Sequence, residues 1–116
     1  MNYQLQNEKI RLTVSSSGAE MQSIVKDGRE YLWNGDETYW GERSPLLFPY
    51  VGRFTEGKYK FGGKEYQMNI HGFAKSSEFS LIKQTEDQLI FELCDTEKHL
   101  SDLPVSFLSE SRIYAY

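Results

Sequence analysis

Two side chains near the middle of the sequence have the chemistry of a polar binding site, Arg53 and His71. The planar guanidinium of Arg53 has five N–H donors, which suit a pair of neighbouring hydroxyls, a carboxylate or a phosphate. Histidine donates or accepts a proton near neutral pH, and the glycine after His71 lets a ligand or another backbone approach closely. Each residue also has a purely structural interpretation. Arg53 could pair with a surface glutamate, and His71 could be half buried against a backbone carbonyl.

Other residue types that often take part in catalysis or ligation are given no such role. His99 lies in a charged segment that we expect to be solvated. Cys94 follows Leu93 on a predicted strand without an adjacent base, so we interpret it as a small buried or edge hydrophobe. Two histidines and one cysteine without ligand spacing predict no metal site. The sequence has no glycine-rich phosphate loop and no Gly-x-Ser-x-Gly motif, and we therefore expect no cofactor.

Aromatic side chains gather in the sequence around Arg53. The C–H face of a sugar ring can stack on an aromatic ring as other apolar groups do. These side chains could therefore form the stacking surface of a carbohydrate site. The alternative is that they belong to the hydrophobic core. The residues are Trp40, Phe48, Tyr50, Phe54 and Phe73.

The composition excludes several classes of protein. The chain has 13 basic and 17 acidic residues, and a net charge of −4 argues against sequence-independent binding of nucleic acid. Its longest uncharged apolar run, residues 45–51, is far shorter than the roughly 20 residues of a membrane span. We therefore expect neither a nucleic-acid nor a membrane partner. No signal peptide is visible and the single cysteine suits a reducing compartment, so the expected location is cytoplasmic.

The pattern of apolar residues predicts a single β-rich domain over residues 1–116, since this length accommodates one ordinary domain. An aromatic content of 15% favours sheet over helix. Alternation and turn residues predict antiparallel hairpins, with Asp27-Gly28 and Gly62-Gly63 as the strongest turn signals. The predicted strands are 10–14, 21–25, 30–33, 58–61, 64–67, 79–83, 89–93 and 105–116, with a helical turn capped by Thr96.

One long segment, residues 34–54, departs from this alternation. It contains two prolines and ends in Gly52, Arg53 and Phe54. Long irregular connections in compact domains are uncommon and often carry function. The sequence therefore places the candidate site here.

The order and spacing of several segments resemble the aldose 1-epimerase (galactose mutarotase) family, closest to its LacX-like branch. The most specific features are the proline-flanked Gly-Arg pair and the His-Gly-Phe-Ala run. The segments that carry the resemblance are 44–53, 57–59, 62–66 and 71–75, together with 18–20 and 30–33 near the N-terminus.

The resemblance implies an all-β fold, an antiparallel β-sandwich of the galactose mutarotase type (a supersandwich), with a sugar site in an open cleft. Residues 1–116 would form the N-terminal part of that single domain, so the sandwich would be incomplete. The family interconverts the α and β anomers of free aldoses by acid–base ring opening without a cofactor. The resemblance further implies that Arg53 and His71 bind and orient the sugar.

The same resemblance places the family's catalytic glutamate and its proton-donating histidine beyond residue 116. We therefore expect no catalytic residue in this chain, and little or no catalysis by the chain alone. Its expected ligand is a hexose such as galactose or glucose. One alternative is a non-catalytic carbohydrate-binding module or a hexose-phosphate epimerase-like module, for which Arg43 is the only nearby extra cation. Another is a structural fragment whose exposed strand edges pair with a partner chain, including a second copy.

Overall fold

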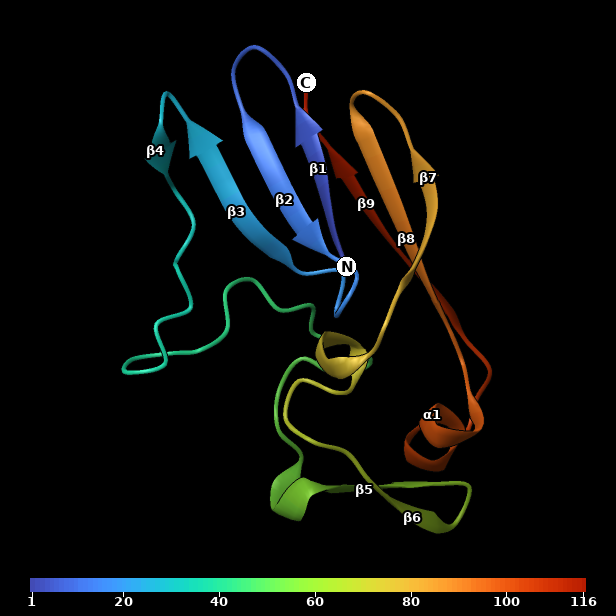
Figure 1. The fold of residues 1–116 in the computed structure, drawn as a ribbon. Helices are drawn as coiled ribbons and strands as arrows, with labels where there is room; N and C mark the ends of the chain where they lie inside the picture. The colour runs from blue at the N-terminus through green and yellow to red at the C-terminus, as the bar shows by residue number, and fades with distance from the viewer.

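The first third of the chain forms an antiparallel meander in the computed structural model, which describes residues 1–116 (Figure 1). Its strands are β1 (Asn2–Gln6), β2 (Arg11–Ser15), β3 (Met21–Lys26) and β4 (Arg29–Glu30), hydrogen-bonded in that order. Asp27 and Gly28 both have positive φ, +51° and +74°, as a tight hairpin turn requires. The predicted strands over 10–14 and 21–25 and the turn between β3 and β4 are confirmed, but β1 was not predicted. The predicted strand over 30–33 is wrong in extent, since pairing ends at Glu30.

A second antiparallel sheet contains β7 (Ser80–Gln84), β8 (Gln88–Cys94) and β9 (Leu108–Tyr114), in the order β7-β8-β9. The central strand alternates in the expected way, and Leu89, Phe91 and Leu93 are all buried. Strand β9 pairs with β8 over its whole length without a bulge. The sequence predicted a longer last strand, over 105–116, but the segment after Pro104 only reaches β8 at Leu108.

The two sheets pack against one another through their apolar faces. Leu5 and Val14 of the first sheet belong to the same buried cluster as Leu89 and Phe91 of the second. Tyr3 meets Phe91 edge to face, with ring centroids 5.6 Å apart. The fold is thus mostly β with antiparallel sheets, as predicted.

A separate two-stranded hairpin and a short helix lie below the sheets in Figure 1. The hairpin consists of β5 (Lys58–Phe61) and β6 (Lys64–Gln67), joined by the predicted Gly62-Gly63 turn. The helix α1 (Glu97–Asp102) begins after Thr96, whose side chain accepts a hydrogen bond from the backbone N–H of His99, as predicted for an N-cap. The Tyr59 hydroxyl donates to the Asp102 carbonyl and so ties the hairpin to the helix.

Two expectations about single residues are wrong. His99 is buried, with 9% exposure, because α1 turns its ring onto Phe73, where the two rings stack 4.5 Å apart. Its Nε2 lies 3.1 Å from the Ser77 hydroxyl oxygen. Cys94 is exposed, because it is the last residue of β8 and points to the face opposite Leu93. Its thiol donates to the Glu92 carboxylate, which raises the pKa of Cys94.

No helix in the structure has the length and apolar character needed to cross a membrane. No group of three or more His, Cys, Asp or Glu side chains is arranged to hold a metal ion.

Candidate functional site

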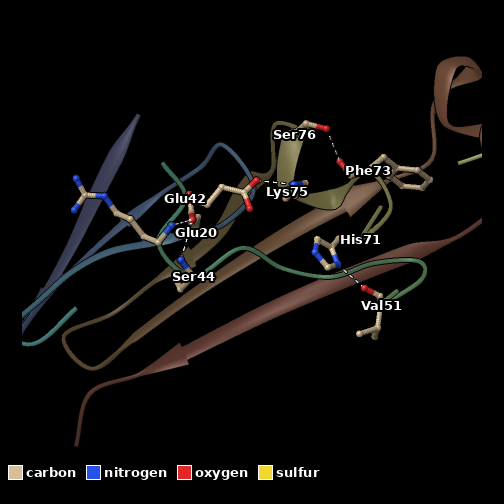
Figure 2. Close-up of polar contacts among 9 residues, drawn as sticks. Glu20, Glu42, Ser44, Val51, His71, Phe73, Lys75 and Ser76 are labelled. Atoms are coloured by element: carbon tan, nitrogen blue, oxygen red, sulfur yellow. Dashed lines mark hydrogen bonds and ion pairs between the residues drawn. The ribbon is translucent and has the colours of Figure 1, made fainter. Parts of the chain in front are cut away.

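The irregular segment before Arg53 is held in place by Glu20, which follows the turn between β2 and β3. One carboxylate oxygen of Glu20 accepts hydrogen bonds from the backbone N–H groups of Arg43 and Ser44, each at 2.9 Å (Figure 2). Nearby, the Lys75 ammonium pairs with the Glu42 carboxylate at 2.5 Å. These contacts fix a stretch of chain that has no regular secondary structure between Glu30 and the short 3₁₀ turn at Thr55–Gly57.

The segment containing His71 crosses this irregular segment in very close contact. The Phe48 carbonyl accepts hydrogen bonds from the backbone N–H groups of Phe73 and Ala74, at 3.0 and 3.1 Å. Gly72 lies directly against it with φ of +75°, and a Cβ on this residue would sit 2.2 Å from the Phe48 oxygen. Only glycine satisfies both the backbone angle and the contact. The sequence expectation of a close backbone approach after His71 is therefore confirmed.

His71 is anchored to the same segment through its backbone and its ring. Its N–H donates to the Gly52 carbonyl at 3.1 Å, and its Nδ1 contacts the Val51 carbonyl (Figure 2). A carbonyl oxygen can only accept, so Nδ1 carries the proton and Nε2 of the neutral ring is an acceptor. No other group in the chain bonds to the His71 ring, so its Nε2 has no partner. The carbonyl contact that the sequence offered as the structural alternative is present, and it leaves one ring nitrogen open for a ligand.

Arg53 is exposed, and its guanidinium forms no ion pair or hydrogen bond within the chain. The ion pair with a surface glutamate that was its alternative role is absent. Arg53 lines a surface hollow of about 460 Å³. The other lining residues are Glu56, Gly57, Met68, Asn69 and Ile70.

The structure brings the two predicted residues onto neighbouring segments. His71 bonds to Val51 and Gly52, the two residues immediately before Arg53. His71 does not itself line the hollow, but Ile70, the residue before it, does. The two predicted residues thus lie on two segments that are hydrogen-bonded to each other, and both segments contribute a residue to the lining of the hollow.

Two polar residues of the hollow, Glu56 and Asn69, were missed by sequence reasoning. Asn69 stands two residues before His71, a proximity that could have drawn attention to it. Glu56 has a left-handed backbone with φ of +58°, in the short turn before Gly57. Nothing in the apolar pattern marks that turn, so the sequence gave no comparable signal for Glu56.

The expected aromatic floor is not present at this hollow, because none of the five aromatic residues lines it. Instead Phe54 stacks between Tyr50 and Tyr59, with centroid separations of 4.0 and 5.1 Å. Phe48 and Phe73 pack against the buried core. The alternative role in core packing therefore holds for Phe48, Phe54 and Phe73, whereas Trp40 and Tyr50 remain exposed, at 48% and 43%.

Arg43 and Lys75, the two cations that contact the irregular segment or its anchor, are already engaged. Arg43 donates from Nη1 to the Gln22 carbonyl at 2.7 Å, which directs it toward the first sheet. Lys75 is paired with Glu42. The hollow itself combines one free guanidinium, one carboxylate and one amide, a set that can donate to and accept from several hydroxyls at once.

A family model described as aldose 1-epimerase matches residues 1–112 of the sequence. The chain belongs to this family. Within the aldose 1-epimerase family it is similar to the plasmid-encoded protein LacX of Lactococcus lactis subsp. lactis, with 31% identity over 99 residues. That match covers 80% of this chain and 33% of LacX.

Solved structures of related proteins show the same fold over the whole chain. A galactose mutarotase related enzyme from Lactobacillus acidophilus superposes with a TM-score of 0.99 at 31% identity, covering 100% of this chain and 39% of that protein. A galactose mutarotase-like protein from Lactobacillus casei gives a TM-score of 0.93 at 30% identity, covering 97% of this chain and 39% of that one. The chain therefore spans between about a third and two fifths of the length of these relatives.

Proposed function

We propose that residues 1–116 form the N-terminal, sugar-binding part of a single aldose 1-epimerase domain, and that Arg53 and His71 contact a neutral hexose such as galactose or glucose. The observation that carries this proposal is that two polar side chains without a hydrogen-bond partner, Arg53 and the Nε2 side of His71, stand on two segments that are hydrogen-bonded to each other. The guanidinium of Arg53 lines the hollow without a partner, and Nε2 of His71, on the segment bonded to Val51 and Gly52, is also unpaired.

The chemistry of the open groups fits hydroxyls. The Arg53 guanidinium donates to sugar oxygens, while Nε2 of neutral His71 and the Glu56 carboxylate accept from sugar O–H groups. Glu56 and Arg53 line the same hollow and have opposite charges, which suits a neutral ligand better than an anionic one. A hexose phosphate would need further free cations, and both Arg43 and Lys75 are engaged elsewhere. The neutral sugar is therefore favoured over the phosphorylated one.

Anomer interconversion needs a base at the anomeric hydroxyl and an acid at the ring oxygen, held in fixed positions. Positioned groups of this kind contribute about 10²–10⁴-fold each. In this proposal Arg53 and His71 bind and orient the sugar, and the proton-transferring pair of the whole domain comes from other residues. The 116-residue chain alone then binds hexoses without accelerating mutarotation.

Calorimetric titration of the chain with D-galactose and D-glucose tests binding. Arg53→Ala removes the free guanidinium and should lower the affinity about tenfold or more, since hydrogen bonds to charged groups are the strong ones. Arg11→Ala is the matched control, because Arg11 is also an exposed arginine and forms no ion pair. Equal affinity of the Arg53→Ala variant and the wild type would overturn the proposal.

A second variant addresses His71. His71 has a left-handed backbone with φ of +68°. Asparagine tolerates this conformation and can still donate to the Val51 carbonyl, but it lacks Nε2. His71→Asn should therefore keep the fold and weaken sugar binding. Polarimetry with freshly dissolved α-D-glucose tests the catalytic part, and a rate clearly above the spontaneous one would contradict it.

A further inference from the structure

His99 has a buried polar atom without a partner. Its side chain is 9% exposed, and Nδ1 of its ring forms no hydrogen bond. A buried polar group that makes no hydrogen bond costs free energy. A phenylalanine at this position would keep the stacking on Phe73 and would avoid that cost. Packing alone therefore does not explain a histidine here.

The other ring nitrogen of His99 starts a chain of two hydrogen bonds. Nε2 lies 3.1 Å from the hydroxyl oxygen of Ser77. That hydroxyl has a single proton and donates it to the Phe73 carbonyl at 2.8 Å. Nε2 of His99 therefore carries a proton and donates to Ser77. Ser76 adds its hydroxyl and its backbone N–H as donors to the same Phe73 carbonyl, each at 3.1 Å (Figure 2).

Phe73 joins these hydrogen bonds to the candidate site. It stands two residues after His71, and its N–H donates to the Phe48 carbonyl at 3.0 Å. Its ring contacts both His99 and Phe48, with centroid separations of 4.5 and 6.1 Å. His99 thus reaches both the carbonyl and the ring of the residue that holds the His71 segment against Phe48.

The helix that carries His99 is itself fixed in place. The N–H of Leu103 donates to the His99 carbonyl at 2.8 Å, and the Tyr59 hydroxyl donates to the Asp102 carbonyl. Binding groups keep their geometry when the residues behind them are locked by packing and hydrogen bonds. Helix α1 therefore gives His99 a fixed position from which to hold Phe73.

We propose that His99 is a positioning residue of the sugar site. Through Ser77 and Phe73 it holds the crossing over Phe48. It thereby fixes the orientation of the His71 ring. His99 does not line the hollow and forms no hydrogen bond with His71, so it acts only through other residues. This inference rests on the proposed sugar-binding function, and its test therefore includes a readout without sugar.

Stability and sugar affinity should respond differently to His99→Phe. The variant removes the unpartnered Nδ1 and keeps an aromatic ring on Phe73, so the urea midpoint should stay the same or rise. The hydrogen bond to Ser77 is lost, so the calorimetric affinity for D-galactose should fall about three- to tenfold. An unchanged affinity, or a loss of affinity together with a loss of stability, would overturn the proposal.

Ser77→Ala tests the route by which His99 acts. It removes both hydrogen bonds of the hydroxyl, so the affinity should fall at least as far as in His99→Phe. The double variant should bind galactose no more weakly than Ser77→Ala alone, and additive losses would contradict the route. Ile90→Val is the control, because Ile90 is buried in β8 outside the hollow. It should lower the urea midpoint and leave the affinity unchanged.

Hydrogen exchange and NMR without sugar separate this proposal from the sugar-binding function. In His99→Phe the Phe73 amide should exchange about three- to tenfold faster, and the ring ¹⁵N signals of His71 should shift. If neither changes, His99 does not position His71, whatever the sugar titration gives. If both change in a protein whose wild type binds no hexose, the positioning of His71 is supported and only its assignment to a sugar fails.

Discussion

Gly72→Ala is the substitution that tests the framework of the site most sharply. The new Cβ would lie 2.2 Å from the Phe48 oxygen and 2.6 Å from the Pro49 nitrogen, so the two backbone segments must separate. A left-handed backbone costs a residue with a Cβ about 1–2 kcal/mol. Separation also breaks the hydrogen bonds from Phe73 and Ala74 to the Phe48 carbonyl, at about 1 kcal/mol each. The free energy of unfolding should fall by about 3–4 kcal/mol.

The chain offers a matched control in Gly28. Its φ is +74°, almost the same as at Gly72, but a Cβ there would meet nothing within 4 Å. Gly28→Ala should therefore lower the free energy of unfolding only by the cost of a left-handed backbone at a residue with a Cβ, about 1–2 kcal/mol. Urea denaturation followed by circular dichroism measures both variants. Equal losses of stability would show that the contact with Phe48 is unimportant and would refute the reasoning.

Three further outcomes follow from other parts of the structure. Hydrogen bonds from the Ser23 hydroxyl and then from the Ile24 and Leu32 N–H groups lower the pKa of Glu30 from 4.5 to about 2. The stabilisation by this carboxylate is therefore present above about pH 4.5 and lost as the pH falls toward 2. An NMR titration should find the Glu30 pKa at about 2. Glu30→Gln should remove the loss of stability that its protonation causes between those pH values. Phe91→Ala, at a fully buried position, should cost about 3–5 kcal/mol in urea denaturation. Glu20→Gln should accelerate hydrogen exchange at the Arg43 and Ser44 amides about tenfold or more, because the charged acceptor is lost.

Sequence reasoning predicts the hairpins of this protein well because their signals are local. The Gly62-Gly63 turn and the alternation of Leu89, Phe91 and Leu93 each lie within a few residues, and both appear as expected. The orientation of His99 depends on Phe73, which is distant in sequence and reaches the ring only through tertiary packing. The same holds for Cys94, whose exposure follows from which face of β8 covers the other sheet.

The sequence named Arg53 and His71 as candidate residues, which stays a prediction, but it did not reveal the residues around them. The glycine after His71 indicated a close approach of a ligand or another backbone, and Gly72 against Phe48 is such a backbone contact. The lining by Glu56 could not be foreseen, because a left-handed turn at a glutamate has no periodic signature. The expected aromatic floor failed because Phe54 and its neighbours satisfy their apolar surfaces by stacking on one another.

The central claim is that Arg53 and His71 jointly contact a sugar, and NMR of the 116-residue chain tests it most directly. Addition of D-galactose should shift the Arg53 side-chain N–H signals and the Nε2 signal of His71 together, with one saturation curve. The Nδ1 signal of His71 should move much less, because that nitrogen is bound to the Val51 carbonyl. Saturating sugar that leaves both side chains unshifted, or that shifts only residues far from them, would contradict the account.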